Sequence, residues 1–138
     1  MDLPRFAKQR EILVLLILAV LVVLVGAINP SFLQAATLLS ILNSSLILIL
    51  VSIGETFVIL TRGIDVSVGA SMGLSAVILG MTLNAGVPLP VAILLAILTG
   101  ALAGLVNGVG VAYIKIPPII MTLGTLGTYR GLMLIITG

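Results

Sequence analysis

The chain of 138 residues contains no histidine and no cysteine, and only ten of its side chains are charged, six of them Lys or Arg and four Asp or Glu. The first two absences remove the commonest metal ligands, the nucleophilic thiol, every disulfide and the side chain that normally titrates near neutral pH. We therefore predict no catalytic, cofactor-binding or metal-binding residue, and an enzyme is the least favoured class of protein.

Charged residues make up 7% of the chain, whereas a soluble domain has about 25%. In their place, 61% of the residues are hydrophobic, and the mean hydropathy is +1.45. This composition indicates a polytopic membrane protein. The net charge of +2 comes from positions that flank the apolar runs, and no basic stripe with interleaved aromatic residues points to nucleic acid.

Five apolar stretches predict an all-α transmembrane helix bundle, since a span needs about 20 residues to cross the hydrocarbon core. The first stretch also resembles a signal peptide, because it follows a basic segment and Val25 and Ala27 resemble a cleavage site. Its length and the spans that follow favour a membrane span. Proline, glycine and asparagine between the stretches mark the turns. The predicted spans are residues 12–28, 37–60, 65–83, 90–113 and 119–136.

Five of the six positive residues fall on one side of the membrane if the N-terminus is cytoplasmic, as the positive-inside rule requires. The sixth, Arg130, lies inside the fifth span, where it must snorkel, face the bundle or mark a helix break. The five are Arg5, Lys8, Arg10, Arg62 and Lys115.

Residues 54–73 contain three of the ten charged side chains: Glu55, Arg62 and Asp65. An ionised group at the centre of a membrane helix costs about 2.5–3.5 kcal/mol, so these charges mark either a turn at the membrane surface or a polar site. The order favours a turn: Arg62 suits the end of a helix, Gly63 is expected in the left-handed conformation, and Asp65 is expected to cap the next helix.

Glu55 precedes Arg62 by two helical turns, which places it about 10 Å away along the axis and argues against a direct ion pair. It either pairs with a neighbouring helix or lines a polar passage. The second span is too polar for a helix surrounded by lipid, which predicts neighbours inside a bundle. Its polar residues are Ser40, Asn43, Ser44, Ser45, Ser52, Glu55 and Thr56.

Glycines recur every four residues in the third and fourth spans and predict close packing between helices. Asn107 lies within the glycine strip of the fourth span, and we expect Asn43, Ser44 and Asn107 to form interhelical hydrogen bonds rather than ligand contacts. The packing glycines are Gly69, Gly73, Gly100, Gly104 and Gly108.

Four blocks of the sequence resemble the permease subunits of bacterial ABC importers for monosaccharides, of the ribose type. The spacing between the blocks also matches, the resemblance covers nearly the whole chain, and it looks closest to permeases for rhamnose and autoinducer-2. The blocks are residues 54–69 (GETFVILTRGIDVSVG), 104–108 (GLVNG), 115–125 (KIPPIIMTLGT) and 129–131 (YRG).

The resemblance implies a transporter subunit in the bacterial inner membrane that binds no cofactor. A second permease subunit would complete the solute pathway, a periplasmic protein would deliver the sugar, and a separate cytoplasmic subunit would hydrolyse ATP. On intramembrane polarity alone, the residues expected to contact the pathway or the polar interior of the bundle are Glu55, Asn107 and Arg130.

Members of this family are considerably longer, so we expect residues 1–138 to be the N-terminal part of a single permease domain that does not transport by itself. Two other classes of protein stay open at this point. One is an ion-coupled secondary carrier or channel that uses Glu55 or Asp65 as its coupling carboxylate. The other is a membrane adaptor that transports nothing.

Overall fold

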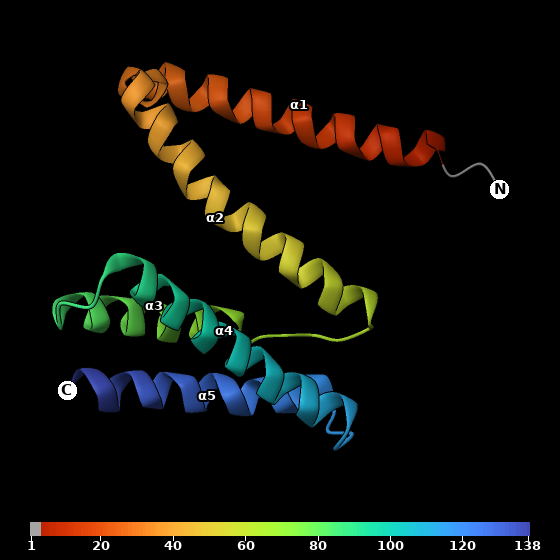
Figure 1. Cartoon of the computed structure of the whole chain (residues 1–138). Helices are drawn as coiled ribbons and strands as arrows, with labels where there is room; N and C mark the ends of the chain where they lie inside the picture. The colour runs from red at the N-terminus through yellow and green to blue at the C-terminus, as the bar shows by residue number, and fades with distance from the viewer. Residues whose placement is uncertain (1–3) are drawn as a thin grey trace. The chain divides into compact units, whose positions relative to one another are not determined.

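The computed structural model describes the backbone of residues 4–138 and the side chains of residues 12–138. These residues form helices and no strands, so the prediction of an all-α fold is confirmed. The side chains of Arg5, Lys8 and Arg10 lie outside the described part. The elements are α1 (Pro4–Ile28), the short 3-10 helix η1 (Pro30–Leu33), α2 (Ala35–Leu60), α3 (Val68–Asn84), α4 (Leu89–Ala112) and α5 (Pro118–Thr137). The five α-helices are labelled in Figure 1.

Three of the described helices, α2, α4 and α5, are long and apolar enough to cross a membrane. Residues Ile12–Ile28 of α1 and the whole of α3 form shorter apolar helices. Each predicted span falls on one of these helices, and the chain has the apolar helices of an α-helical membrane protein. Among residues 12–138, the helix end that lies furthest from its predicted span boundary is the start of α3. The helix begins at Val68, whereas the predicted span begins at residue 65.

The chain divides into two compact units, residues 1–50 and 51–138. In the first, Asn29 ends α1 and caps η1, because its side-chain oxygen accepts a hydrogen bond from the Ser31 amide (3.1 Å). Gly26 is buried against Leu33, and a Cβ at Gly26 would lie 2.7 Å from the Leu33 Cδ1 atom. The glycine therefore allows the chain to turn back tightly against α1.

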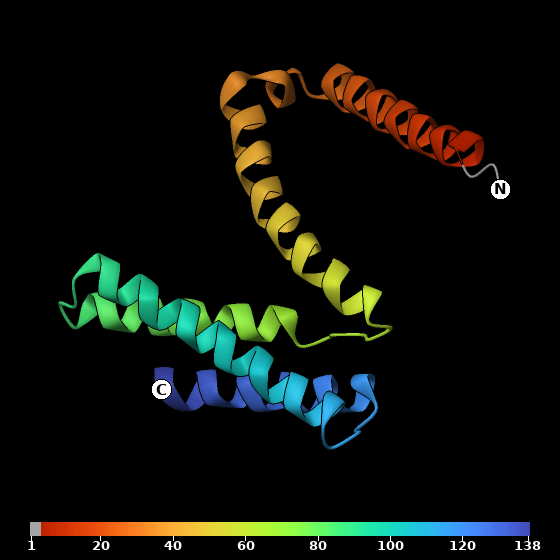
Figure 2. The same cartoon turned by 45° about the vertical axis from the view of Figure 1, so that its right-hand side comes forward.

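In the second unit, α3 packs against both α4 and α5, and α4 also contacts α5; the three helices lie together in Figures 1 and 2. Their core is small and contains Ala70 and Leu74 of α3, Ala103 of α4 and Tyr129 of α5. Many large apolar side chains of the described helices are exposed, as expected of surfaces that face lipid or further protein.

Small residues let these helices approach closely, but not at every predicted position. A Cβ at Gly73 would lie 2.9 Å from the Met133 sulfur of α5, and one at Gly100 would lie 3.2 Å from the Ser75 hydroxyl of α3. The tightest approach, 2.5 Å to the Met121 sulfur, is at Gly110, which the sequence analysis did not assign to packing. At Gly69, Gly104 and Gly108 a Cβ would meet nothing within 4 Å in the described chain.

Two hydroxyl groups of helix α2 are satisfied within the helix itself. None of its side chains is buried in the structure as described. The two hydroxyl groups bond within the helix: Ser45 donates to the Ile41 carbonyl (2.8 Å) and Thr56 to the Ser52 carbonyl (2.7 Å). A hydroxyl that bonds one turn back is satisfied without a neighbouring helix.

The turn after α2 differs from prediction in one residue. Arg62, not Gly63, adopts the left-handed conformation, with φ of 60°. The Arg62 amide donates to the Ile59 carbonyl and the Gly63 amide to the Val58 carbonyl, both at 2.9 Å, which is the Schellman pattern with Arg62 at its left-handed position. Gly63 has little free space around it, since a Cβ there would lie 3.1 Å from the Val58 Cγ1 atom, which would have to shift slightly.

The turn after α3 has the same pattern with glycine in the left-handed position. Gly86 has φ of 80°; its amide donates to the Leu83 carbonyl (3.0 Å), and the Val87 amide donates to the Thr82 carbonyl (3.0 Å). No neighbouring atom restricts the space around Gly86, so only its backbone conformation calls for glycine.

We predict that Gly86→Ala lowers the stability of the full-length protein by about 1 kcal/mol, because a Cβ is unfavourable in the left-handed region. The matched control is Gly80→Ala, in a helix and with open space around it, which is expected to keep or raise stability by up to about 1 kcal/mol. Unfolding in mixed micelles, followed by circular dichroism, measures both. Equal losses in the two variants would contradict the assignment of Gly86.

Candidate functional site

A cavity of about 240 Å³ lies in the second unit, between the end of α2, the connection to α3, and helices α4 and α5. It is partly open, and most of its lining is apolar. Three of its lining residues carry the polar groups on which the site depends: Asp65, Asn107 and Thr122. The other lining residues are Val58, Thr61, Gly63, Ile64, Gly104, Gly108, Val111 and Pro118.

Asp65 does not cap α3 in the way the sequence predicts. Helix α3 begins three residues later, at Val68, and its N-cap residue is Ser67. One carboxylate oxygen of Asp65 accepts two hydrogen bonds from Ser67, from the backbone amide (2.7 Å) and from the hydroxyl (2.6 Å). This is an Asx turn, in which the carboxylate fixes the residue before the helix rather than its first turn.

The Ser67 hydroxyl begins a chain of hydrogen bonds that joins three helices. Ser67 is fully buried, and its oxygen accepts a bond from the Asn107 side-chain amide of α4 (2.8 Å). The Asn107 carbonyl oxygen accepts a bond from the Thr125 hydroxyl of α5 (2.7 Å). We call Asp65, Ser67, Asn107 and Thr125 the polar relay.

The direction of every bond in the polar relay follows from the carboxylate. The Ser67 hydroxyl donates to the Asp65 oxygen, so it can offer only its lone pairs to the Asn107 side chain. The NH₂ group of Asn107 then faces Ser67 and its oxygen faces Thr125. No buried side-chain nitrogen or oxygen among the described residues lacks a hydrogen-bond partner. The relay therefore has one consistent arrangement of protons.

Two further residues of α5 tie the same elements together. The Thr122 hydroxyl accepts a bond from the Val66 amide (3.3 Å), which links α5 to the connection that leads into α3. Its oxygen also lies 3.2 Å from the Ile64 carbonyl and 2.9 Å from the Pro118 carbonyl of its own helix, and its one proton is shared between them. The Tyr129 hydroxyl donates to the Ala103 carbonyl of α4 (2.8 Å) inside the core. Thr122, Thr125 and Tyr129 recur at helical spacing, so one face of α5 makes all these contacts.

This arrangement can position helices and present a carboxylate and an amide to a cavity. The described residues contain no cluster of acidic side chains suited to a metal ion. The Ser67 hydroxyl donates to the Asp65 carboxylate, which ties it into the hydrogen bonds that join the helices.

Of the three residues expected at a pathway or in the polar interior, the polar relay includes Asn107 alone. Glu55 is half-buried on α2, and Arg130 is exposed on α5, next to Tyr129 but outside the relay. The sequence analysis did not single out Ser67, Thr122, Thr125 or Tyr129. The helical spacing of polar residues along α5 could have indicated Thr122, Thr125 and Tyr129.

We predict that Asn107→Ala destabilises the full-length protein by about 1–2 kcal/mol, since two helices lose their bonds to α4 and buried polar groups lose partners. The matched control is Asn84→Ala at the exposed end of α3, expected to stay within about 0.5 kcal/mol of the parent. Thermal unfolding of the purified proteins in detergent compares the two. Similar losses at both positions would contradict a structural role for the polar relay.

Relatives of known function were found by sequence comparison. The chain is 54% identical over 131 residues to the autoinducer 2 import system permease protein LsrC of Escherichia coli O9:H4, and equally so to the protein of that name in E. coli K12. It is 52% identical to LsrC of Salmonella typhi. Each alignment covers 95% of this chain but 38% of the relative, so the chain spans well under half the length of these proteins.

No solved structure was found to match the chain. The resemblance to sugar and autoinducer-2 permeases seen in the sequence blocks is confirmed by these relatives. The sequence pattern of one transporter family matches residues 37–138. This range covers α2, without its first two residues, through α5, and it contains the polar relay and the cavity. The chain therefore belongs to the family of permease components described as the branched-chain amino acid transport system.

Proposed function

We propose that this chain is part of the permease subunit of an ATP-driven importer, and that the imported solute is autoinducer 2 or a related monosaccharide. The observation that carries the proposal is the 54% identity to autoinducer 2 import permeases across 95% of the chain. The geometry is compatible with this function, because a permease requires membrane-spanning helices held in register around polar groups rather than a catalytic centre.

The proposal includes the partners that such a subunit needs. A second permease subunit, identical or distinct, would complete the pathway, a periplasmic protein would deliver the solute, and a cytoplasmic subunit would hydrolyse ATP. Residues 1–138 would then belong to one permease domain in the bacterial inner membrane. A cytoplasmic N-terminus puts Arg62 and Lys115 on the cytoplasmic side, in agreement with the positive-inside rule.

Glu55, Asn107 and Arg130 are proposed to act at the pathway or at its polar walls. For Asn107, the support is its place in the cavity lining and its bonds to Ser67 and Thr125. For Glu55 and Arg130, the support is their charge within membrane helices, since ionisable groups there usually face a partner or a water-filled passage. Both would be directed toward protein or solute outside residues 1–138.

The test is uptake by the full-length permease reconstituted in liposomes with its ATP-binding subunit and its periplasmic binding protein. We expect uptake of labelled autoinducer 2 to require ATP on the cytoplasmic side, to stop when hydrolysis by the ATP-binding subunit is blocked, and to continue when an ionophore collapses the proton gradient. Labelled ribose and rhamnose in parallel reactions identify the preferred solute.

Uptake driven by an ion gradient without ATP would contradict the proposal and favour a secondary carrier. Assembly with the partner subunits without uptake of any tested solute would favour an adaptor.

Asn107→Ala and Asn84→Ala are assayed together at a temperature where both remain folded. We expect slower uptake, by about tenfold or more, from Asn107→Ala alone, because misplaced pathway groups reduce rates strongly.

A further inference from the structure

Two connections of the second unit carry a basic residue in the left-handed backbone conformation. Arg62 has φ of 60° and Lys115 has φ of 67°, and no other non-glycine residue of the described chain has positive φ. A side chain with a Cβ is disfavoured there, and outliers of this kind concentrate at functional positions. The question is why arginine and lysine occupy positions that suit glycine.

The backbone alone does not explain Arg62. The turn after α3 makes the same pair of Schellman hydrogen bonds as the turn after α2, and there the left-handed residue is Gly86. The same chain thus uses glycine where only the turn is needed. The difference at residue 62 is the presence of a long cationic side chain.

Both cations lie at the same end of the second unit. The cavity is lined by residues on either side of each connection, Gly63 for the first and Val111 and Pro118 for the second. Arg62 follows the last residue of α2 by two positions, and Lys115 follows the last residue of α4 by three. Since α2 and α4 are long and apolar enough to cross a membrane, these cations lie where the spans end.

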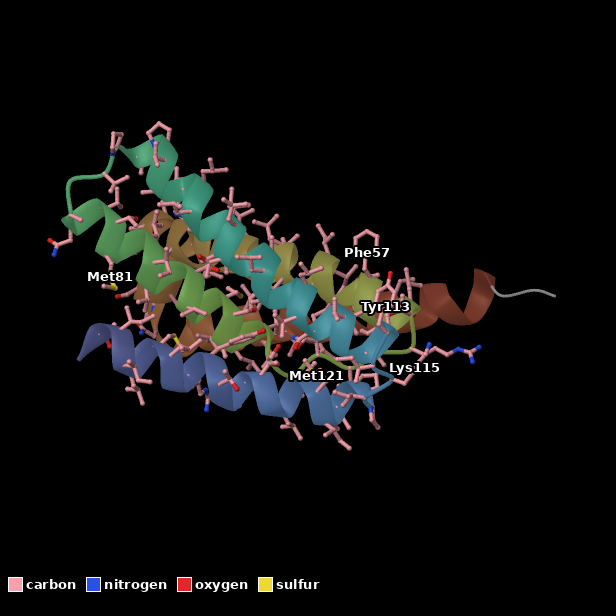
Figure 3. The ribbon with its side chains drawn as sticks, turned by 60° about the horizontal axis from the view of Figure 1, so that its bottom comes forward. Phe57, Met81, Tyr113, Lys115 and Met121 are labelled. Atoms are coloured by element: carbon pink, nitrogen blue, oxygen red, sulfur yellow. The ribbon has the colours of Figure 1, made fainter. Side chains whose placement is uncertain are left out.

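Exposed apolar and aromatic side chains flank the two cations. Tyr113 is 82% exposed, Ile114 65% and Leu60 73%. Figure 3 shows Tyr113 and Lys115 at one end of the unit, with Phe57 of α2 near Tyr113 in that view. An aromatic residue and a cation beside an apolar span are typical of the level at which lipid headgroups meet acyl chains.

We propose that Arg62 and Lys115 together bind the phosphate-bearing headgroup of an anionic phospholipid. Neither side chain forms an ion pair within the described part of the chain. A lipid fits better than an acidic protein surface, because acyl chains would cover Leu60, Tyr113 and Ile114 beside the bound headgroup. The proposal requires membrane-spanning helices and is independent of which solute is transported.

The full-length permease in detergent is titrated with phosphatidylglycerol, and in parallel with phosphatidylcholine, while native mass spectrometry counts the bound lipids. The variants are Arg62→Gly, Lys115→Gly and the double substitution. Glycine tolerates the left-handed conformation at both positions, so the variants keep the turns. Thermal unfolding confirms that each variant is folded.

We expect each substitution to weaken phosphatidylglycerol binding about fivefold, which corresponds to the usual contribution of one basic residue near an anionic membrane surface. Phosphatidylcholine binding should not change, and Arg62→Lys, which keeps the charge, should retain most of the affinity. Gly86→Arg adds a cation in the same turn geometry at the end of α3 and serves as a control for charge placed elsewhere; it should not restore the loss caused by Arg62→Gly.

Equal phosphatidylglycerol affinity in the parent and the double variant would overturn the proposal. If lipid binding is unchanged but the variants lose binding to the ATP-binding subunit, the cations recognise an acidic protein surface and the lipid proposal is wrong. The lipid titration does not depend on transport, so a failure of the lipid proposal is distinguishable from a failure of the proposed function.

Discussion

The amide of Asn107 is buried, and each of its polar groups needs a partner, because an unsatisfied buried group costs about 1–3 kcal/mol. The partners lie on two other helices: Ser67 at the start of α3 and Thr125 on α5. Since lipid provides no replacement for these bonds, sliding one helix against the others would leave polar atoms unpaired. Asp65 accepts a hydrogen bond from the Ser67 hydroxyl, and this fixes the direction of the bonds from Ser67 to Asn107 and from Asn107 to Thr125.

These bonds form only because the helices come close. Hydrophobic exclusion from water contributes little between helices in a membrane, so close packing and hydrogen bonds must hold them together. Gly73 beside Met133 brings α3 and α5 together, and Gly110 beside Met121 does the same for α4 and α5. Packing and the polar relay therefore depend on each other. The cavity borders this fixed region and takes its polar lining from Asp65, Asn107 and Thr122.

The parts of the fold that depend on local sequence could be predicted. Apolar runs identified the helices, and Pro90 marked the start of α4, since proline suits a first turn. Pro117 and Pro118 were expected to end the fourth span, and in the structure they also form the N-cap and first residue of α5. The exchange between Arg62 and Gly63 could not be predicted, because which residue becomes left-handed depends on where the last helical bond falls. A shift of one residue at the end of α2 moves the whole Schellman pattern.

The candidate site was predicted only in part, because its contacts join residues far apart in the chain. Ser67 and Asn107 are 40 residues apart, and no periodicity in the sequence reports that they meet. Asn107 could be singled out because an amide inside an apolar helix needs a partner, but the partner could not be named. Gly104 and Gly108 share the spacing of Gly100 yet line the cavity instead of a close helix contact, since spacing alone does not identify the face that meets a neighbour.

The central claim is that hydrogen bonds through Asn107 hold α3, α4 and α5 together, and a double-mutant cycle between Asn107→Ala and Thr125→Val tests it most directly. The free energy of unfolding of the full-length protein is measured for the parent, both single variants and the double variant. We expect a coupling energy of about 0.5–1.5 kcal/mol between the two residues. A control cycle pairs Asn107→Ala with Thr128→Val. Thr128 is exposed on α5 and bonds to the Gly124 carbonyl of its own helix, so this cycle should give no coupling. Additive losses for Asn107 and Thr125, as in the control, would contradict the account.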